Sequence, residues 1–120
     1  VSKLTVLWPE KQIVGDDLLA MKDERLKMGM EKKSANTLLL KVNQSGTVSE
    51  ALKTAAMAKN SRFEITASLR SGETNDTFQA DLAVAVGAKQ MKLGWPVRGE
   101  RNGKYNRLMR IEEDLMSAVI

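Results

Sequence analysis

Four short apolar segments alternate along the chain with four longer segments of helical character. The apolar segments lie near residues 12–15, 37–42, 63–68 and 89–93, and the helical segments cover 23–33, 47–59, 74–87 and 100–116. Short apolar runs bounded by polar loops are typical of strands buried in a sheet. Four strand–helix repeats therefore predict an α/β fold of parallel βα units, in a single domain over residues 1–120.

The helical segments carry signals at their first residues and along their faces. Thr47 and Glu50 have the spacing of a capping box, in which both side chains bind free backbone N–H groups. We expect the helix over 74–87 to be capped near Thr74 or Asn75. We expect the last helix to turn its apolar side chains inward, namely Leu108, Ile111, Leu115 and Met109.

Composition narrows the chemistry that the chain can perform. It has 120 residues, of which 42% are hydrophobic, and this is enough for the core of one domain. It has no Cys and no His, which excludes disulfides, thiolate nucleophiles, imidazole bases and the usual zinc ligands. A bound metal must then be a hard cation held by oxygen, such as Mg²⁺, and a base must be Lys, Asp, Glu or Tyr.

Membranes and nucleic acids are not favoured as partners. No segment is apolar over the roughly 18 residues that a span needs, and the N-terminus lacks the apolar core of a signal peptide. With no Cys, this predicts a cytoplasmic protein; the lack of an initiator Met indicates processing or a fragment. The net charge is +4, but the basic stretches mix both signs and aromatic residues are only 4%, so nucleic-acid binding is unlikely.

A charged side chain lies at or just after the end of each predicted strand. Asp16 and Asp17 end the first, Lys41 the second, Arg70 and Ser71 the third, and Lys92 the fourth. Parallel βα folds place their sites at these carboxyl ends. Because three cations and a carboxylate would meet there, we expect an anionic substrate bound with a divalent metal.

Each of these residues also has a structural interpretation. Asp16 and Asp17 could form a turn and a helix cap, and Arg70 and Ser71 could simply begin a loop. Lys41 lies in an apolar strand, so it must either extend its ammonium to solvent or be buried at a cost, as a lysine base can be.

Four stretches of the sequence together resemble the enolase family: "QIVGDDL", "LLLKVNQSGTVSEA", "RSGETNDTFQADLAV" and "KYNRLMRIEEDL". The resemblance runs in order from about Gln12 to Leu115. It implies that the chain is a partial barrel domain, similar to the second half of an enolase-type (β/α)8 TIM barrel. The family reaction that it implies is the Mg²⁺-dependent dehydration of 2-phosphoglycerate to phosphoenolpyruvate in glycolysis.

The resemblance also implies a role for each candidate residue. Asp16 resembles a carboxylate ligand of the metal, and Lys41 resembles the base that removes the proton α to the substrate carboxylate. Ser68, Arg70 and Ser71 resemble the substrate loop, with Arg70 on the phosphate and Ser71 near a second metal. Lys92 resembles the lysine that faces the substrate carboxylate. The implied ligand is thus a phosphorylated small-molecule acid.

The sequence departs from the family pattern at the site. Leu69 stands where the family has a histidine, and Leu93 and Trp95 replace small or polar residues in "KLGWP". Two further metal carboxylates and the general-acid glutamate belong to parts of the family's protein that this sequence does not include. We therefore expect the chain alone to be inactive. The alternatives are an enolase-derived non-catalytic structural or binding protein within a larger assembly, or an engineered half-barrel.

An unclosed barrel predicts a partner. Four βα units leave two open sheet edges, and we expect inner-face side chains such as Leu38, Leu40 and Ile65 to remain exposed. We therefore expect a homo-oligomer, or a complementing chain that pairs with the open edges.

Overall fold

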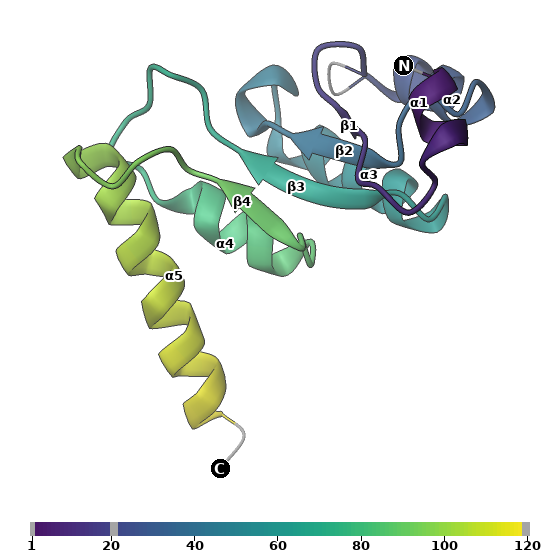
Figure 1. Ribbon diagram of the computed structural model, residues 1–120. Helices are drawn as coiled ribbons and strands as arrows, with labels where there is room; N and C mark the ends of the chain where they lie inside the picture. The colour runs from purple at the N-terminus through teal and green to yellow at the C-terminus, as the bar shows by residue number, and fades with distance from the viewer. Residues whose placement is uncertain (1, 20–21, 119–120) are drawn as a thin grey trace.

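Four parallel strands form the centre of the computed structural model, which describes residues 2–19 and 22–118 (Figure 1). They are β1 (Val14–Gly15), β2 (Thr37–Leu40), β3 (Glu64–Ser68) and β4 (Gln90–Lys92), and they lie in the order β1-β2-β3-β4. Each falls within one of the four apolar segments of the sequence. This arrangement confirms the predicted α/β fold of parallel βα units.

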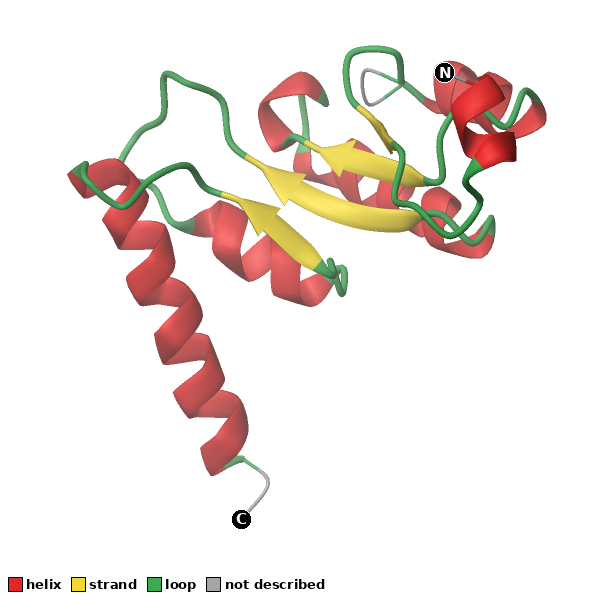
Figure 2. Cartoon of the chain, in the orientation of Figure 1, coloured by secondary structure: helices red, strands yellow, loops and turns green. Residues whose placement is uncertain are grey.

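Three helices connect successive strands, namely α2 (Asp23–Glu31), α3 (Val48–Asn60) and α4 (Phe78–Ala85), and the 3₁₀ helix η1 (Val42–Gln44) lies before α3. Helices α3 and α4 cover one face of the sheet (Figure 2). Helix α1 (Ser2–Leu7) precedes β1, and α5 (Gly99–Ser117) follows β4. The core lies between this face and the helices, where Leu38, Leu40 and Ile65 pack with alanines of α3 such as Ala55. No described helix has the combination of length and apolar character needed to cross a membrane.

The capping box at the start of α3 is confirmed. The Glu50 backbone N–H donates to the Thr47 hydroxyl at 3.2 Å, and the Thr47 backbone N–H donates to the Glu50 carboxylate at 3.2 Å. The buried face of α3 includes one polar residue. Leu52 is 44% exposed, whereas Thr54 is buried and donates a hydrogen bond to Asp23 at 3.0 Å.

The prediction for the start of α4 is wrong by about four residues. The helix begins at Phe78, and residues 74–77 are a loop with its own hydrogen bonds. The Asp76 carboxylate accepts from the Phe78 backbone N–H at 2.7 Å, and the Thr74 hydroxyl accepts from the Asp76 N–H at 3.4 Å. Short polar side chains that bind nearby backbone groups compete with the helix, which explains the late start.

The prediction that Leu38, Leu40 and Ile65 lie exposed on the inner face is also wrong. Leu38 and Leu40 are fully buried and Ile65 is 2% exposed, because all three point toward the helices. The opposite face, here called the inner face, carries Leu39 and Thr66, which are paired in register. Side chains alternate between the faces of a strand, so an error of one residue exchanges the two sets.

The apolar side chains of α5 do not turn inward as predicted. Met109 is 54% exposed and Leu115 56% exposed, and Leu108 and Ile111 are only half-buried. The reason is geometric: α5 extends away from the sheet in Figure 1, and α4, the helix that it contacts, has 8 residues against its own 19.

Candidate functional site

The carboxyl ends of the four strands bring several candidate residues to the inner face. Strand alternation and register place Lys41, Ser68 and Lys92 on this face, since Ser68 pairs with Lys92 and Leu39 pairs with Thr66. A hollow of about 580 Å³ opens on the inner face. Its lining consists of Val14, Asp16, Leu39, Thr66, Gln90, Met91 and Lys92.

Lys41 is the buried charge of this face. Lys41 is 8% exposed, and its ammonium forms an ion pair with Asp16, whose side chain is 40% exposed. The interpretation in which Lys41 extends to solvent is therefore wrong. A buried ammonium needs a partner to offset the loss of water, and Asp16 supplies it from the turn after β1.

The two adjacent aspartates point to different partners. Asp16 contacts Lys41, whereas the Asp17 carboxylate accepts a hydrogen bond from Gln44 in η1 at 3.2 Å. The turn interpretation also holds, because the Asp16 carbonyl accepts from the Leu19 N–H at 2.9 Å. The pair thus shapes the turn and leaves one carboxylate at the edge of the inner-face hollow.

The segment after β3 has a different environment from Lys41. Ser68 is buried and donates to the Leu69 carbonyl at 3.1 Å. It lines a second cavity of about 230 Å³, bordered by the loop before α4 and the start of η1. The RSGE loop (residues 70–73) follows, and Arg70 and Ser71 at its start are exposed. The structure therefore joins Asp16 with Lys41, and neither Arg70 nor Ser71 lines the inner-face hollow that Asp16 borders.

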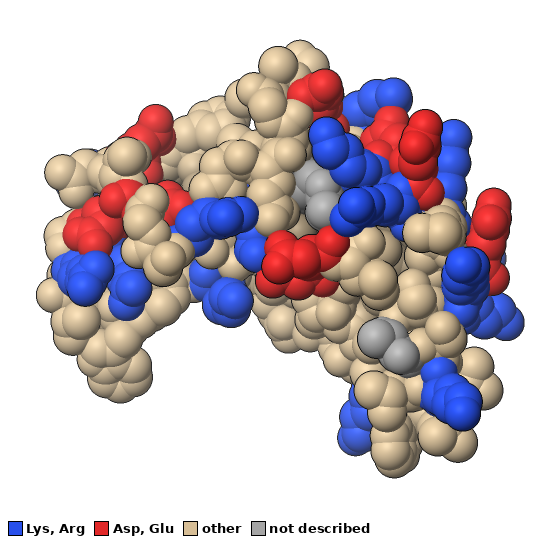
Figure 3. All heavy atoms as spheres, turned by 90° about the horizontal axis from the view of Figure 1, so that it is seen from above, with Lys and Arg blue, Asp and Glu red and all other residues tan. Residues whose placement is uncertain are grey.

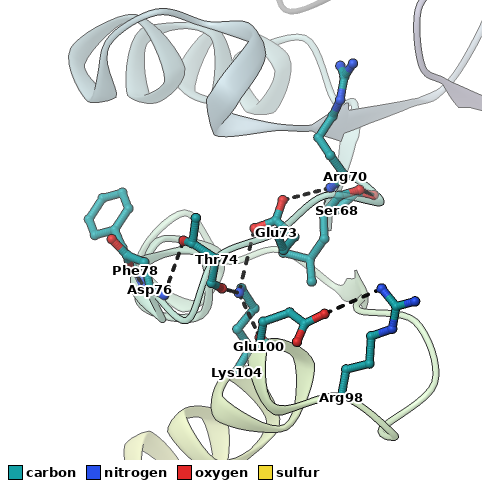
Figure 4. Close-up of polar contacts among 10 residues, drawn as sticks. Ser68, Arg70, Glu73, Thr74, Asp76, Phe78, Arg98, Glu100 and Lys104 are labelled. Atoms are coloured by element: carbon teal, nitrogen blue, oxygen red, sulfur yellow. Dashed lines mark hydrogen bonds and ion pairs between the residues drawn. The ribbon is translucent and has the colours of Figure 1, made fainter.

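Two residues that the sequence analysis missed hold the RSGE loop. Glu73 accepts a hydrogen bond from the Arg70 backbone N–H at 2.9 Å, and the buried Lys104 of α5 lies 3.7 Å from the same carboxylate. Figure 4 shows the guanidinium of Arg70 directed away from this contact. Lys104 follows Glu100 by four residues, a spacing that is typical of an exposed helical pair, so its burial could not be predicted from the sequence pattern.

The residues that depart from the family pattern also differ in exposure. Leu69 is 9% exposed and Leu93 4% exposed, so both add apolar packing near the strand ends. Trp95 is 74% exposed. The side chain at position 69 therefore contributes no hydrogen bond or charge to the site, in contrast to the histidine of the family pattern.

The carboxylates in the described part of the chain are not grouped as a magnesium site. Within residues 2–19 and 22–118 no group of three or more Asp or Glu side chains is arranged to hold a metal. Asp16, the candidate ligand, is engaged by the ammonium of Lys41. Mg²⁺ takes near-octahedral oxygen ligation, and one carboxylate beside an ammonium does not supply it.

Two ion pairs outside the site join neighbouring helices. Arg107 of α5 donates to both Asp81 carboxylate oxygens at 3.0 Å, and this lowers the pKa of Asp81. Lys53 similarly lowers the pKa of Asp23, mainly through a side-chain hydrogen bond. The face seen in Figure 3 carries acidic side chains beside basic ones. This mixture is typical of a solvated surface.

Comparisons with known proteins agree with the fold. The family model described as "Enolase, C-terminal TIM barrel domain" matches residues 3–120. The enolase of Beutenbergia cavernae is 55% identical over 109 residues, which are 91% of this chain and 26% of the relative. Enolase 1 of Entamoeba histolytica is 53% identical over 114 residues, or 95% and 26%. The enolase of Methanococcus maripaludis is 57% identical over 104 residues, or 87% and 24%. The chain thus spans about a quarter of the length of these curated relatives.

Proposed function

This chain belongs to the enolase family, and we propose that it supplies the C-terminal part of a barrel that dehydrates 2-phosphoglycerate to phosphoenolpyruvate. The carrying observation is the buried Lys41 paired with Asp16 at the carboxyl ends of β1 and β2. A buried lysine at a strand end of a parallel βα fold has few structural uses that an apolar residue would not serve as well.

In this proposal Lys41 is the base. As an ion pair with Asp16 its ammonium carries a proton, so it must leave the carboxylate and lose that proton before it can act. The neutral amine then removes the proton α to the substrate carboxylate. Lys92 lines the inner-face hollow together with Asp16, the partner of Lys41, and would bind that carboxylate, which stabilises the negative charge that develops on it.

The RSGE loop would bind the phosphate. Arg70 offers an exposed guanidinium, which suits the bidentate recognition of phosphate, and Ser71 and Ser68 offer hydroxyls nearby. Arg70 does not line the inner-face hollow where Lys92 lies, so binding one ligand with both side chains would require the loop to approach that hollow. Loop closure of this kind is common among enzymes that exclude water from their sites.

The complete site needs residues from outside this chain. Asp16 would provide one carboxylate of a magnesium site, and the other ligands and the general acid would come from the rest of the barrel. The edges of β1 and β4 and the inner-face hollow are the surfaces available to a complementing chain or a second copy. Thr66 fits this view, because its hydroxyl is buried there without a hydrogen-bond partner among the described residues. A cytoplasmic location and a place in glycolysis belong to the same proposal.

A non-catalytic member of the family is the second candidate. Leu69 favours it, because a buried leucine replaces a polar group of the family site. In that case Lys41 and Asp16 would be a structural pair, and the assembly would not depend on them.

The first test is the native mass of the purified particle, with mass spectrometry of all its chains. Turnover of 2-phosphoglycerate would then be measured for this chain mixed with a relative's polypeptide that covers the missing part of the barrel. We expect Mg²⁺-dependent turnover that Lys41→Met lowers at least about 10²-fold. Lys89→Met, which removes an exposed surface ion pair with Glu64, is the matched control. Equal turnover in both variants would contradict the proposal, as would an inactive completed barrel.

A further inference from the structure

A lysine of α5 beside the RSGE loop is more deeply buried than Lys41. Lys104 is 1% exposed, and it is the buried residue of a helix whose other described side chains are half-buried or exposed. We propose that Lys104 is a positioning residue for the RSGE loop: its buried ammonium holds Glu73, and Glu73 holds the backbone of Arg70. The inference rests on the proposed function only in taking this loop to bind phosphate.

The ammonium of Lys104 has three acceptor groups around it. It donates to the carbonyl of Thr74 at 2.8 Å and to the carbonyl of Glu100 at 2.9 Å, and it forms an ion pair with Glu73 at 3.7 Å (Figure 4). Two of the three N–H donors of the ammonium thus form hydrogen bonds, and the contact with Glu73 is electrostatic. Lys104 therefore joins α5 to the loop segment after β3 at two points, a backbone carbonyl and a carboxylate.

Glu73 passes this constraint to the start of the loop. Its side chain is 18% exposed, with one carboxylate oxygen toward Lys104 and the other accepting from the Arg70 N–H. Gly72, between them, has nothing within 4 Å of where a Cβ would lie, so packing does little to order the loop. Without Lys104 the Glu73 carboxylate would lose its positive partner and turn toward water, which would free the Arg70 backbone.

The arrangement also suits an anion. A carboxylate next to a phosphate site would repel the ligand, and Lys104 offsets that charge from the interior. Arg70 keeps its guanidinium directed away from Glu73, so the charge that would meet the phosphate is not consumed by the internal contact (Figure 4).

Order in the ligand-free loop is the direct test. Backbone ¹⁵N order parameters and amide exchange would be measured on the whole chain for wild type, Lys104→Met and Arg107→Met. We expect order parameters of residues 70–73 to fall below about 0.6 in Lys104→Met and to stay near wild-type values in Arg107→Met. Arg107 is the matched control, because it also anchors α5, through Asp81, without touching the loop. An ordered loop in Lys104→Met overturns the inference.

A second pair of variants keeps the test decisive if Lys104→Met does not fold. Glu73→Gln retains an oxygen that can accept the Arg70 N–H, whereas Glu73→Met does not. We expect the Arg70 amide to exchange roughly fivefold faster in Glu73→Met, and less so in Glu73→Gln. Equal exchange in both would show that Glu73 does not hold the loop.

Titration with inorganic phosphate, followed by the amide shifts of Arg70, Ser71 and Gly72, separates the two proposals. We expect the phosphate Kd to rise about tenfold in Arg70→Gln, and by a smaller factor in Lys104→Met. If wild type shows no shifts while Lys104→Met loses loop order, phosphate binding by this loop is overturned and the positioning role stands. If Lys104→Met binds phosphate as well as wild type does, the positioning role is overturned.

Discussion

The region from β2 to α3 and the region from the RSGE loop to α5 differ in what holds their helices. Helix α3 packs its buried alanines against Leu38, Leu40 and Ile65. Helix α5 is attached mainly through polar groups: Lys104 to the loop before α4, Tyr105 to the Gly94 carbonyl at 2.7 Å, and Arg107 to Asp81. Apolar burial stabilises the contact between α3 and the sheet without a preferred direction, whereas the few polar contacts of α5 depend on the orientation of the helix.

This difference indicates which surfaces are incomplete. The apolar side chains of α5 remain largely exposed although they follow a helical period, so the surface that would bury them is not part of this chain's described structure. The relatives are about four times as long as the segments that they share with this chain. The core under β2 and β3, in contrast, is completed by the chain's own helices.

The largest expected effect compares one leucine from each region. Leu40→Ala removes a fully buried side chain and should lower the free energy of unfolding by about 2–5 kcal/mol. Leu115→Ala, the same change on the exposed face of α5, should stay within about 0.5 kcal/mol. Urea denaturation of both variants measures this. Similar losses would mean that α5 is packed as tightly as α3.

The capping box gives a smaller effect within the apolar region. Thr47→Ala should cost about 1 kcal/mol, because the Glu50 N–H loses its acceptor at the start of α3. Ser49→Ala, which changes an exposed residue two positions after Thr47, is the control and should change stability little. If the two variants have equal midpoints in urea, the cap does not contribute to the stability of this region.

The same contrast explains how much could be predicted from the sequence. The strands and the cap of α3 were predictable, because apolar runs and local spacing determine them. The environment of the apolar face of α5 was not predictable. The helical period of its apolar residues shows that one face is apolar, but not whether a neighbouring element covers that face. Asp16 and Lys41 were found from their places at strand ends. Lys104 was not, because its partners are backbone carbonyls, which any sequence provides.

A still smaller effect tests the polar attachment of α5. Asp81→Asn removes the charge that Arg107 binds, and since both side chains are more than a third exposed the loss should be at most about 1 kcal/mol. Amide exchange should rise in the first half of α5 while α3 keeps its protection. Glu112→Gln, on the exposed part of α5, is the control. Faster exchange in α3 as well would mean that the two regions unfold together.

The smallest effect is a dependence on pH that both regions share. Lys53 lowers the pKa of Asp23 between α2 and α3, and Arg107 lowers the pKa of Asp81 between α4 and α5. A carboxyl with a lowered pKa in the folded state contributes stability that is present above its ordinary value of 3.8 and is lost as pH falls through the folded value. The pKa of Lys53 is raised, so its contribution is present below 10.5 and lost at higher pH.

NMR titration of the carboxyl carbons can assign the loss of stability at low pH to one region or the other. We expect the midpoints of Asp23 and Asp81 to lie below 3.8 in wild type. Arg107→Met should return the Asp81 midpoint toward 3.8 and leave Asp23 unchanged, and Lys53→Met should do the reverse. A shift of both midpoints in either variant would show that the helices of the two regions are coupled through the sheet. The polar attachment of α5 would then be part of the core rather than an addition to it.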